Sequence, residues 1–364
     1  MIHFKSSDWN RVSKNFENWW EKKSSGALVG CMIKKYPPSG RIPSKPLLTQ
    51  NNVHLNFTAD EILDSVEYEL SQYEFIGDAF PMFSMDCFGP GIVAAFLGCS
   101  MDNNNGRTSI WFRPDKKYEI TEFKPVFDAE NPVYKRIRGI LKRAAERFEG
   151  RILVSMPDLG GCADILSSFF PGEELMLEMY DDPESVLAAI TRIDDLWQKY
   201  YDDFSDCLHS ELYGYTDWSK TLSKKRSSVI QSDISYMLSH EMFETFIFES
   251  LKKHTERLDR TLFHMDGVGE LKNLKDLLSL EKLDAIQWVP GDFGGKESYA
   301  EWMDVYNQIL DADKLVQIFL ASYEEVETIV RGVKKKGYIQ QGMKIFSAEQ
   351  REYAISCVER IKSL

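Results

Sequence analysis

The sequence predicts an α/β protein built as one (β/α)8 barrel with an irregular N-terminal extension. Three observations support this fold class. Helical segments with clear start signals alternate with short apolar runs, these runs are apolar on both faces, and repeats or long flexible linkers are absent. Strands that are apolar on both faces are typical of a parallel sheet covered by helices. A length of 364 residues allows two domains or one large barrel, and the missing linker favours one.

The N-terminal part is the least regular. Roughly to Asp128 it mixes aromatic and turn residues, as in YPPSGRIPSKP, although Thr58 and Glu61 have the spacing of a capping box. We therefore expect one domain over residues 1–364, with 1–74 as an extension or cap and 75–364 as the barrel.

Strong helix and strand signals follow. Long helices are expected to begin at Asn131-Pro132 and Asp182-Pro183, where a capping residue precedes a proline at the first helical position. Ser322 with Glu325 and Ser347 with Gln350 also resemble capping boxes. The expected strands are RILVSM, SVIQSD, RTLFHMD, DAIQWVP, LVQIFLA and YIQQG.

The choice between an open sheet and a closed barrel depends on the loops. Neither GxGxxG nor GxxxxGK[ST] follows any strand, so the phosphate-binding loops of an open nucleotide-binding sheet are missing. Polar residues instead follow many strands, and a barrel builds its active site from the ends of several strands. The pattern therefore favours the barrel.

Charge and composition exclude several classes of protein. A net charge of -13 argues against binding to nucleic acid or to anionic membranes, and no apolar stretch is long enough to span a bilayer. The six cysteines are scattered, which predicts free thiols in a reducing compartment. We expect a soluble cytoplasmic protein with a small-molecule substrate, and its oligomeric state, with a homodimer as one option, stays open.

The densest candidate site is the segment His264-Met265-Asp266. Residues two apart on a strand point to the same face, so His264 and Asp266 could converge on one proton or one metal ion. The alternative is a buried histidine held by a carboxylate that caps the next helix. Asp233, beside Gln231, could point into the same barrel mouth or satisfy loop amides.

Turn chemistry or core packing offers an alternative for the remaining candidates. Asp158 and Asp292 lie beside glycines, where an Asp often serves a turn. Trp111, Trp218 and Trp288 could offer flat apolar surfaces to a ligand, although core packing is the more frequent role of tryptophan. Gln287-Trp288, at the end of a strand, is the strongest exception.

These segments resemble the uroporphyrinogen decarboxylase superfamily, a family of (β/α)8 barrels that includes corrinoid-dependent methyltransferases. The resemblance is clearest over HMDGVGELKNLKDLLSLEKLDAIQWVPGDFGG and SMPDLGGCADILSSFFPGEELMLEMYDDPESV, and it covers about residue 75 to the C-terminus. It extends through IQSDISYMLSHEMFETF and DCFGPGIVAAFLG.

The resemblance implies roles for particular residues. Decarboxylases of the superfamily use an Asp near the end of the first barrel strand, which Asp86 matches, but their RxxGR segment is absent here. The methyltransferases bind zinc through His-x-Cys and a Cys on the last strand, and here His264 stays while Asp266 and Gln341 replace the cysteines. A His264–Asp266 site would hold zinc more weakly and without thiolate ligands.

The leading hypothesis is a methyltransferase that acts on a small methylated compound or a corrinoid and is metal-assisted or uses an acid/base pair. His264, Asp266, Asp233 and Asp86 are its candidate catalytic residues, zinc and a corrinoid on a partner protein its candidate cofactors. The alternatives are a decarboxylase or other lyase acting on a polycarboxylate or tetrapyrrole, and a degenerate barrel that only binds a ligand. The clustered carboxylates favour methyl transfer because they suit a metal or a cationic ligand.

Overall fold

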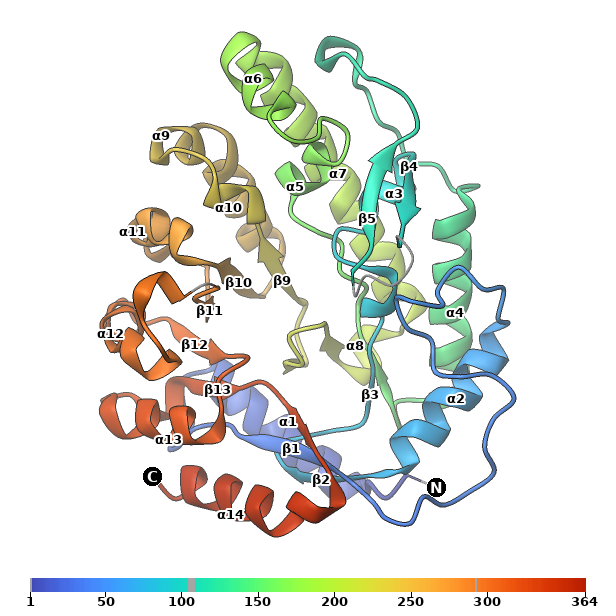
Figure 1. Cartoon of the computed structure of the whole chain (residues 1–364), viewed down its shortest axis with the longest axis vertical. Coiled ribbons are helices and arrows are strands. Elements are labelled where there is room, and N and C mark those ends of the chain that lie inside the picture. The colour runs from blue at the N-terminus through green and yellow to red at the C-terminus, as the bar shows by residue number, and fades with distance from the viewer. Residues whose placement is uncertain (1, 104–108, 292) are drawn as a thin grey trace.

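The computed structural model describes residues 2–103, 109–291 and 293–364. It shows a mixed α/β fold in which helices surround a set of mostly parallel strands (Figure 1). Within these residues, the helices all fall short of the length and apolarity needed to cross a membrane.

The strands are short, and most of their pairings are parallel. They are β1 (Gly30–Lys34), β2 (Tyr73–Gly77), β3 (Met82–Phe83), β4 (Cys99–Asp102), β5 (Trp111–Pro114), β6 (Leu153–Val154), β7 (Tyr215–Thr216), β8 (Leu222–Ser223), β9 (Ser227–Gln231), β10 (Arg260–Asp266), β11 (Ala285–Val289), β12 (Leu315–Ile318), β13 (Ile339–Gln341) and β14 (Lys344–Phe346).

The helices vary more in length. They are α1 (Ser6–Trp20), α2 (Ala59–Ser71), α3 (Val93–Phe96), α4 (Pro132–Phe148), α5 (Cys162–Ser167), α6 (Glu174–Asp181), α7 (Pro183–Cys207), α8 (Ser210–Tyr213), α9 (His240–Met242), α10 (Phe248–Arg257), α11 (Leu274–Ser279), α12 (Met303–Asp311), α13 (Tyr323–Gly332) and α14 (Arg351–Lys362). The predicted capping boxes are present at Thr58, Ser322 and Ser347.

The central element is a parallel sheet of five strands in the order β13-β12-β11-β10-β9. Five of the six predicted strands form it, and the sixth, β6, pairs in parallel with β3. The α/β class with a parallel sheet is therefore confirmed. Among the described residues the strand ladders do not close into one ring, so closure of the (β/α)8 barrel stays a prediction.

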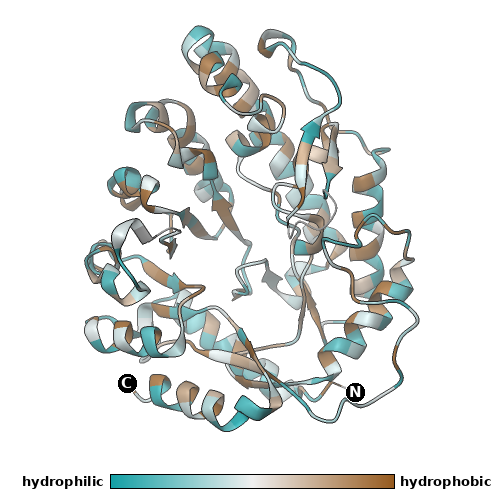
Figure 2. Cartoon of the chain, in the orientation of Figure 1, coloured by the Kyte–Doolittle hydropathy of each residue, from teal (hydrophilic) through white to brown (hydrophobic). Residues whose placement is uncertain are grey.

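The two faces of the five-stranded sheet pack against different partners. Successive residues of a strand point to opposite faces. One face carries Val229, Leu262, Ala285 and Leu315, which pack in the same apolar cluster as α1. The other face carries Ile230, Phe263, Ile286, Val316 and Ile339, which belong to the core shared with the outer helices. These helices show brown and teal residues on different sides in Figure 2, as expected for helices that cover a sheet.

The N-terminal extension is more regular than the sequence predicted. Residues 6–20 form an amphipathic helix, α1, whose buried side chains are Val12, Phe16, Trp19 and Trp20. Two indole groups fix its position, because Trp19 Nε1 donates to the Tyr338 carbonyl at 3.0 Å and Trp20 Nε1 donates to the Leu222 carbonyl at 2.9 Å. The prediction overlooked that Val12, Phe16 and Trp19 recur at helical spacing. Thus α1 covers the face of the five-stranded sheet that carries Val229, Leu262, Ala285 and Leu315.

Removing the Trp20 side chain should destabilise the fold strongly. We expect Trp20→Ala to lower the free energy of unfolding by about 3–5 kcal/mol, because a buried indole leaves a cavity and an unpaired carbonyl. Urea unfolding followed by circular dichroism measures the change. The matched control is Trp111→Ala, since Trp111 is 55% exposed, and it should stay within about 0.5 kcal/mol of the wild type. Equal losses in both variants would contradict the assigned role of α1.

Candidate functional site

A row of polar side chains crosses the five-stranded sheet at one level. Each member lies on the α1-facing side of its strand, and register pairs each with its neighbour. The members of this polar row are Gln231, His264, Gln287, Gln317 and Gln340. Four of them follow an apolar member of the α1 cluster by two residues, so the strand period alone brings all five into one layer.

Hydrogen bonds run along this polar row in one direction. Gln317 Nε2 donates to Gln340 Oε1 at 2.6 Å, Gln287 Nε2 donates to Gln317 Oε1, and His264 Nδ1 contacts Gln287 Oε1. Two backbone carbonyls fix the direction, since Gln340 Nε2 donates to the Gln341 carbonyl and Gln317 Nε2 to that of Ser219. A backbone carbonyl can only accept a hydrogen bond, so the NH2 groups of Gln317 and Gln340 must face these two carbonyls, and their Oε1 atoms are left as acceptors for the next side chain in the row.

The tautomer of His264 follows from that direction. Gln287 Oε1 is left as an acceptor, so His264 Nδ1 must carry a proton. Burial lowers the pKa of His264, while the Asp266 charge raises it. In the neutral ring, Nε2 therefore carries no proton and keeps its lone pair. This atom lies 3.9 Å from Asp266 Oδ2. His264 can thus accept a proton at Nε2, or hold one against Asp266 once it is charged.

A pocket of about 320 Å³ lies above the polar row. It brings together six of the predicted residues from five separate chain segments. Its lining is Gln50, Asp86, Gly89, Pro90, Asp158, Trp218, Lys220, Gln231, Asp233, His264 and Phe319. Trp218 lies edge-on to the His264 ring, with centroids 5.0 Å apart, and to Phe319 at 5.8 Å. The pocket therefore joins carboxyl groups, one imidazole and two aromatic rings.

The carboxyl groups of the pocket carry less charge than the sequence suggests. Burial raises the pKa of Asp86, and it raises that of Asp158 well above its usual range, with help from the Asp233 and Asp86 charges. Burial and the Asp266 charge raise the pKa of Asp233 to about 6. These shifts favour the protonated form of each carboxyl group, so the pocket offers groups that can donate protons as well as accept them.

The sequence reasoning missed three charged residues of this region. Lys220 lines the pocket, and burial lowers its pKa while the Asp86 charge raises it. Asp164 accepts hydrogen bonds from the backbone N–H groups of Asp233 at 3.0 Å and Ile234 at 2.8 Å, and its pKa rises to about 7 through burial and the Asp233 charge. Glu270 is 1% exposed, and burial raises its pKa well above the usual range. None of the three lies at the end of a strand, and the sequence analysis selected candidate site residues by that position.

Metal binding was the other predicted role of His264 and Asp266. Catalytic zinc sites use three protein ligands. Within the described residues, no third His, Cys, Asp or Glu places a donor atom within 4.8 Å of both side chains. The pair offers two donors and does not fit zinc as it stands, so acid/base chemistry suits it better.

Four predicted binding residues lie elsewhere or outside the description. Trp111 is exposed on β5 and is not part of the pocket lining. Trp288 is fully buried in the layer between sheet and helices, where it packs against Trp302 at 5.2 Å, because it alternates with inward-facing Gln287. Gln341 is buried beside Gln340. Asp292 lies outside the described residues.

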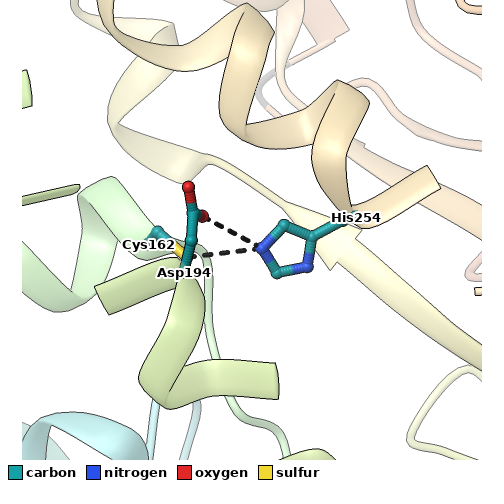
Figure 3. Close-up of side chains that lie close together, drawn as sticks. All are labelled: Cys162, Asp194 and His254. Carbon is teal, nitrogen blue, oxygen red and sulfur yellow. Dashed lines mark hydrogen bonds and ion pairs between the residues drawn. The ribbon is translucent and has the colours of Figure 1, made fainter. Parts of the chain in front are cut away.

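A second cluster of polar side chains lies in the helix layer beside β9. Figure 3 shows Cys162, Asp194 and His254 turned toward one another. His254 Nε2 lies 3.4 Å from Cys162 Sγ and 3.2 Å from Asp194 Oδ1, and Ser250 Oγ donates to the same carboxylate oxygen at 2.5 Å. These are zinc-type donors, but Lys253 also pairs with Asp194 at 3.8 Å. Hydrogen bonds and this ion pair link the side chains, while His254 Nδ1 is buried without a partner among the described residues. Burial raises the pKa of the Cys162 thiol well above its usual range.

Comparison with known proteins identifies the fold but not a close relative. The chain matches neither a protein-family profile nor a curated protein sequence. A methyltransferase from Methanosarcina mazei has a similar structure, with a TM-score of 0.60 and 10% sequence identity, over 96% of this chain and 98% of that chain. This protein has the fold of that methyltransferase. The resemblance to a superfamily that includes methyltransferases is thus confirmed at the level of the fold.

Zinc content should not depend on His264. We expect wild type and His264→Ala to retain the same amount of zinc after incubation with the metal and dialysis, because the His264–Asp266 pair lacks a third ligand. Plasma mass spectrometry measures the bound metal, and Cys162→Ser is the matched control at the second cluster. If zinc is lost in His264→Ala and retained in Cys162→Ser, the pair is a metal site after all.

Proposed function

We propose that the protein is a methyltransferase that acts on a small methylated compound in the pocket above the polar row. One observation carries the proposal: His264, with its Nε2 lone pair free, shares the pocket with carboxyl groups whose pKa values are raised. The likeness of the fold to a methyltransferase supports it. A degenerate barrel is expected to scatter His264, Asp266 and Asp233. His264 and Asp233 line one cavity, and Asp266, which is not part of that lining, lies 3.9 Å from His264 Nε2, so this arrangement favours an active site.

Residue roles follow from what methyl transfer demands. When a methyl group leaves an ether or an amine, the heteroatom takes the bonding electron pair and needs a proton. Asp233 in its protonated form can supply that proton, and His264 Nε2 can then accept or return one, held by Asp266. Asp86 and Asp158 complete the lining, and Trp218 offers an aromatic edge beside the reacting group.

The methyl acceptor or donor is proposed to be a corrinoid carried by a partner protein. A corrinoid supplies a metal centre that takes or gives a methyl group. A pocket of about 320 Å³ lies at the lower end of the range for small-molecule sites, about 300–1,000 Å³, and is too small to enclose such a macrocycle. The methylated compound therefore belongs inside the pocket and the carrier outside it.

We also infer that eight strand segments close into a (β/α)8 barrel. Backbone hydrogen bonds connect segments beyond the five-stranded sheet: Ser155 N–H to the Phe83 carbonyl at 2.9 Å, Met156 N–H to the Thr216 carbonyl at 2.8 Å, and Leu28 N–H to the Ile339 carbonyl at 2.9 Å. Such a barrel would place the pocket at the carboxyl ends of its strands.

The alternative of a lyase acting on a polycarboxylate has one supporting residue. Among the residues that the structure describes, Lys220 is the only Lys or Arg in the lining of this pocket, and burial lowers its pKa. Several carboxylates on one substrate would need several cations, and the described lining of this pocket offers one. Methyl transfer therefore ranks first.

Methyl transfer should depend on His264. With cob(I)alamin as acceptor and a panel of small methyl ethers, thioethers and methylamines, we expect one class to form methylcobalamin, measured by absorbance. His264→Ala should lower the rate by at least about 100-fold, because acid/base catalysis typically contributes 10²–10⁴. The matched control is His209→Ala, whose side chain is exposed outside the pocket, and it should keep the wild-type rate. No transfer from any class, or full activity in His264→Ala, would refute the proposal.

The rate should fall as the pH rises through about 6. The pKa of Asp233 is raised to about 6, so this carboxyl is still half protonated at a pH where an ordinary aspartic acid is ionised. If the protonated form is the proton donor, activity is greatest below this pH. We expect Asp233→Asn to be slower at low pH and to lose this fall, whereas exposed Asp181→Asn should keep it. The pH profile of kcat/KM measures both, and a wild-type rate that rises through pH 6 would contradict the assigned role.

A further inference from the structure

We call the pocket above the polar row, which is lined by His264 and three aspartates, the acidic pocket. A second, apolar cavity lies against it. Its volume is about 400 Å³, within the range of small-molecule sites. Its walls come from two parts of the chain that lie far apart in sequence. The N-terminal extension contributes Met32, Leu47, Leu48, Val66 and Leu70, and the body of the fold contributes Phe80, Met82, Phe83 and Met343.

The two cavities meet at three residues. Gln50, Asp86 and Lys220 line both the apolar cavity and the acidic pocket, and we call these three residues the neck. Gln50 Nε2 donates to the backbone carbonyl of Asp86 at 3.1 Å, which ties the extension to the site. A molecule that passes the neck would therefore reach both chambers.

Two buried polar atoms at the neck lack hydrogen-bond partners among the residues that the structure describes. Gln50 Oε1 and Asp86 Oδ1 are enclosed and accept no hydrogen bond from any described residue. A buried acceptor without a partner costs about 1–3 kcal/mol, so native proteins rarely keep one without a reason. Two such acceptors at the junction of two cavities indicate a ligand with a hydroxyl or amino donor at this point.

The chemistry of the apolar cavity indicates the body of that ligand. Among its polar walls, Glu69 is occupied, since Tyr73 Oη donates to it at 2.7 Å. The remaining surface away from the neck is mainly aliphatic, methionine and phenylalanine side chains. Methionine adapts its shape and its sulfur contacts aromatic rings favourably, so this wall suits a flat, neutral aromatic body better than a charged one.

We propose that the two cavities form one binding site for a neutral aromatic compound that carries a methylated heteroatom. The aromatic body occupies the apolar cavity, a hydroxyl or amino group donates to Gln50 and Asp86 at the neck, and the methylated group faces His264. The proposal rests on the proposed function for the role of the methylated group only. Binding of the aromatic body is independent of it.

Calorimetric titration of the full-length protein with 2-naphthol tests the proposal. We expect saturable binding, and we expect Met82→Trp, which fills the cavity, to weaken it by about tenfold or more. Leu47→Arg adds a long charged side chain to the lining from a partly exposed position and should do the same without threatening the core. The control is Leu177→Trp, on an exposed face of α6, which should bind like the wild type. Naphthalene, which lacks the donor, should bind more weakly than 2-naphthol.

The outcomes separate this proposal from the proposed function. Absence of saturable binding to the wild type, or equal affinity in the wild type and both cavity variants, overturns the two-chamber site. If 2-naphthol binds as expected and 3-methoxy-2-naphthol, which carries both the hydroxyl donor and the methylated oxygen, gives no methyl transfer to cob(I)alamin, together with the rest of the methyl-donor panel, the methyltransferase function fails and the binding site stands.

Discussion

The arrangement of the site depends on the register of one parallel sheet. Neighbouring strands are aligned so that Gln231, His264, Gln287, Gln317 and Gln340 all fall at one level and on one face. Amides in an apolar interior must find partners there, because an unpaired buried amide costs more than the bond contributes. Gln287, Gln317 and Gln340 find partners in each other, and two backbone carbonyls fix the direction of this hydrogen-bond chain. A one-residue slip of any strand would turn its polar residue toward the helices.

This constraint also sets the chemistry of His264. An imidazole that must donate from Nδ1 presents a free Nε2, whatever the pocket later binds. The neighbouring carboxyl groups respond to the same burial in the opposite sense, since desolvation disfavours the charged form of each group. The result is a pocket in which desolvation favours the uncharged form of both the acids and the base. The overall charge of -13 therefore says little about the charge that a ligand meets inside.

The sequence predicted much of the sheet and part of the site, for reasons that can be traced to residues. Apolar runs and capping residues are local signals, so five strands of the main sheet and the helices at Asn131 and Asp182 could be predicted. Polar residues at strand ends located His264 and Asp233 for the same reason. The inward direction of Gln317 and Gln340 depends on register between distant strands, which a single sequence does not encode visibly.

Residues that act from outside the strands were the ones missed. Lys220 and Gln50 reach the pocket from loops, and a loop Lys or Gln has no periodic signal. Trp288 was misplaced for a related reason, because the same strand end offers two faces and Gln287 takes the inward one. Asp164 and Glu270 belong to helical turns behind the strand ends. A charged residue in such a turn can be recognised as part of the site only when the fold shows which other turns lie beside it.

The N-terminal extension contributes to two parts of the interior, the apolar layer beneath the polar row and the wall of the apolar cavity. Through α1 it covers the apolar layer beneath the polar row, with Trp20 hydrogen-bonded to the backbone of β8 and Trp19 to the backbone just before β13. Through α2 and the segment around Leu48 it walls the apolar cavity, and Gln50 reaches the neck. A domain boundary near residue 74 would therefore separate α1 from the apolar layer that it covers and would divide the lining of the apolar cavity between two domains. We infer that residues 1–74 and 75–364 fold as one unit, because neither part could bury these surfaces by itself.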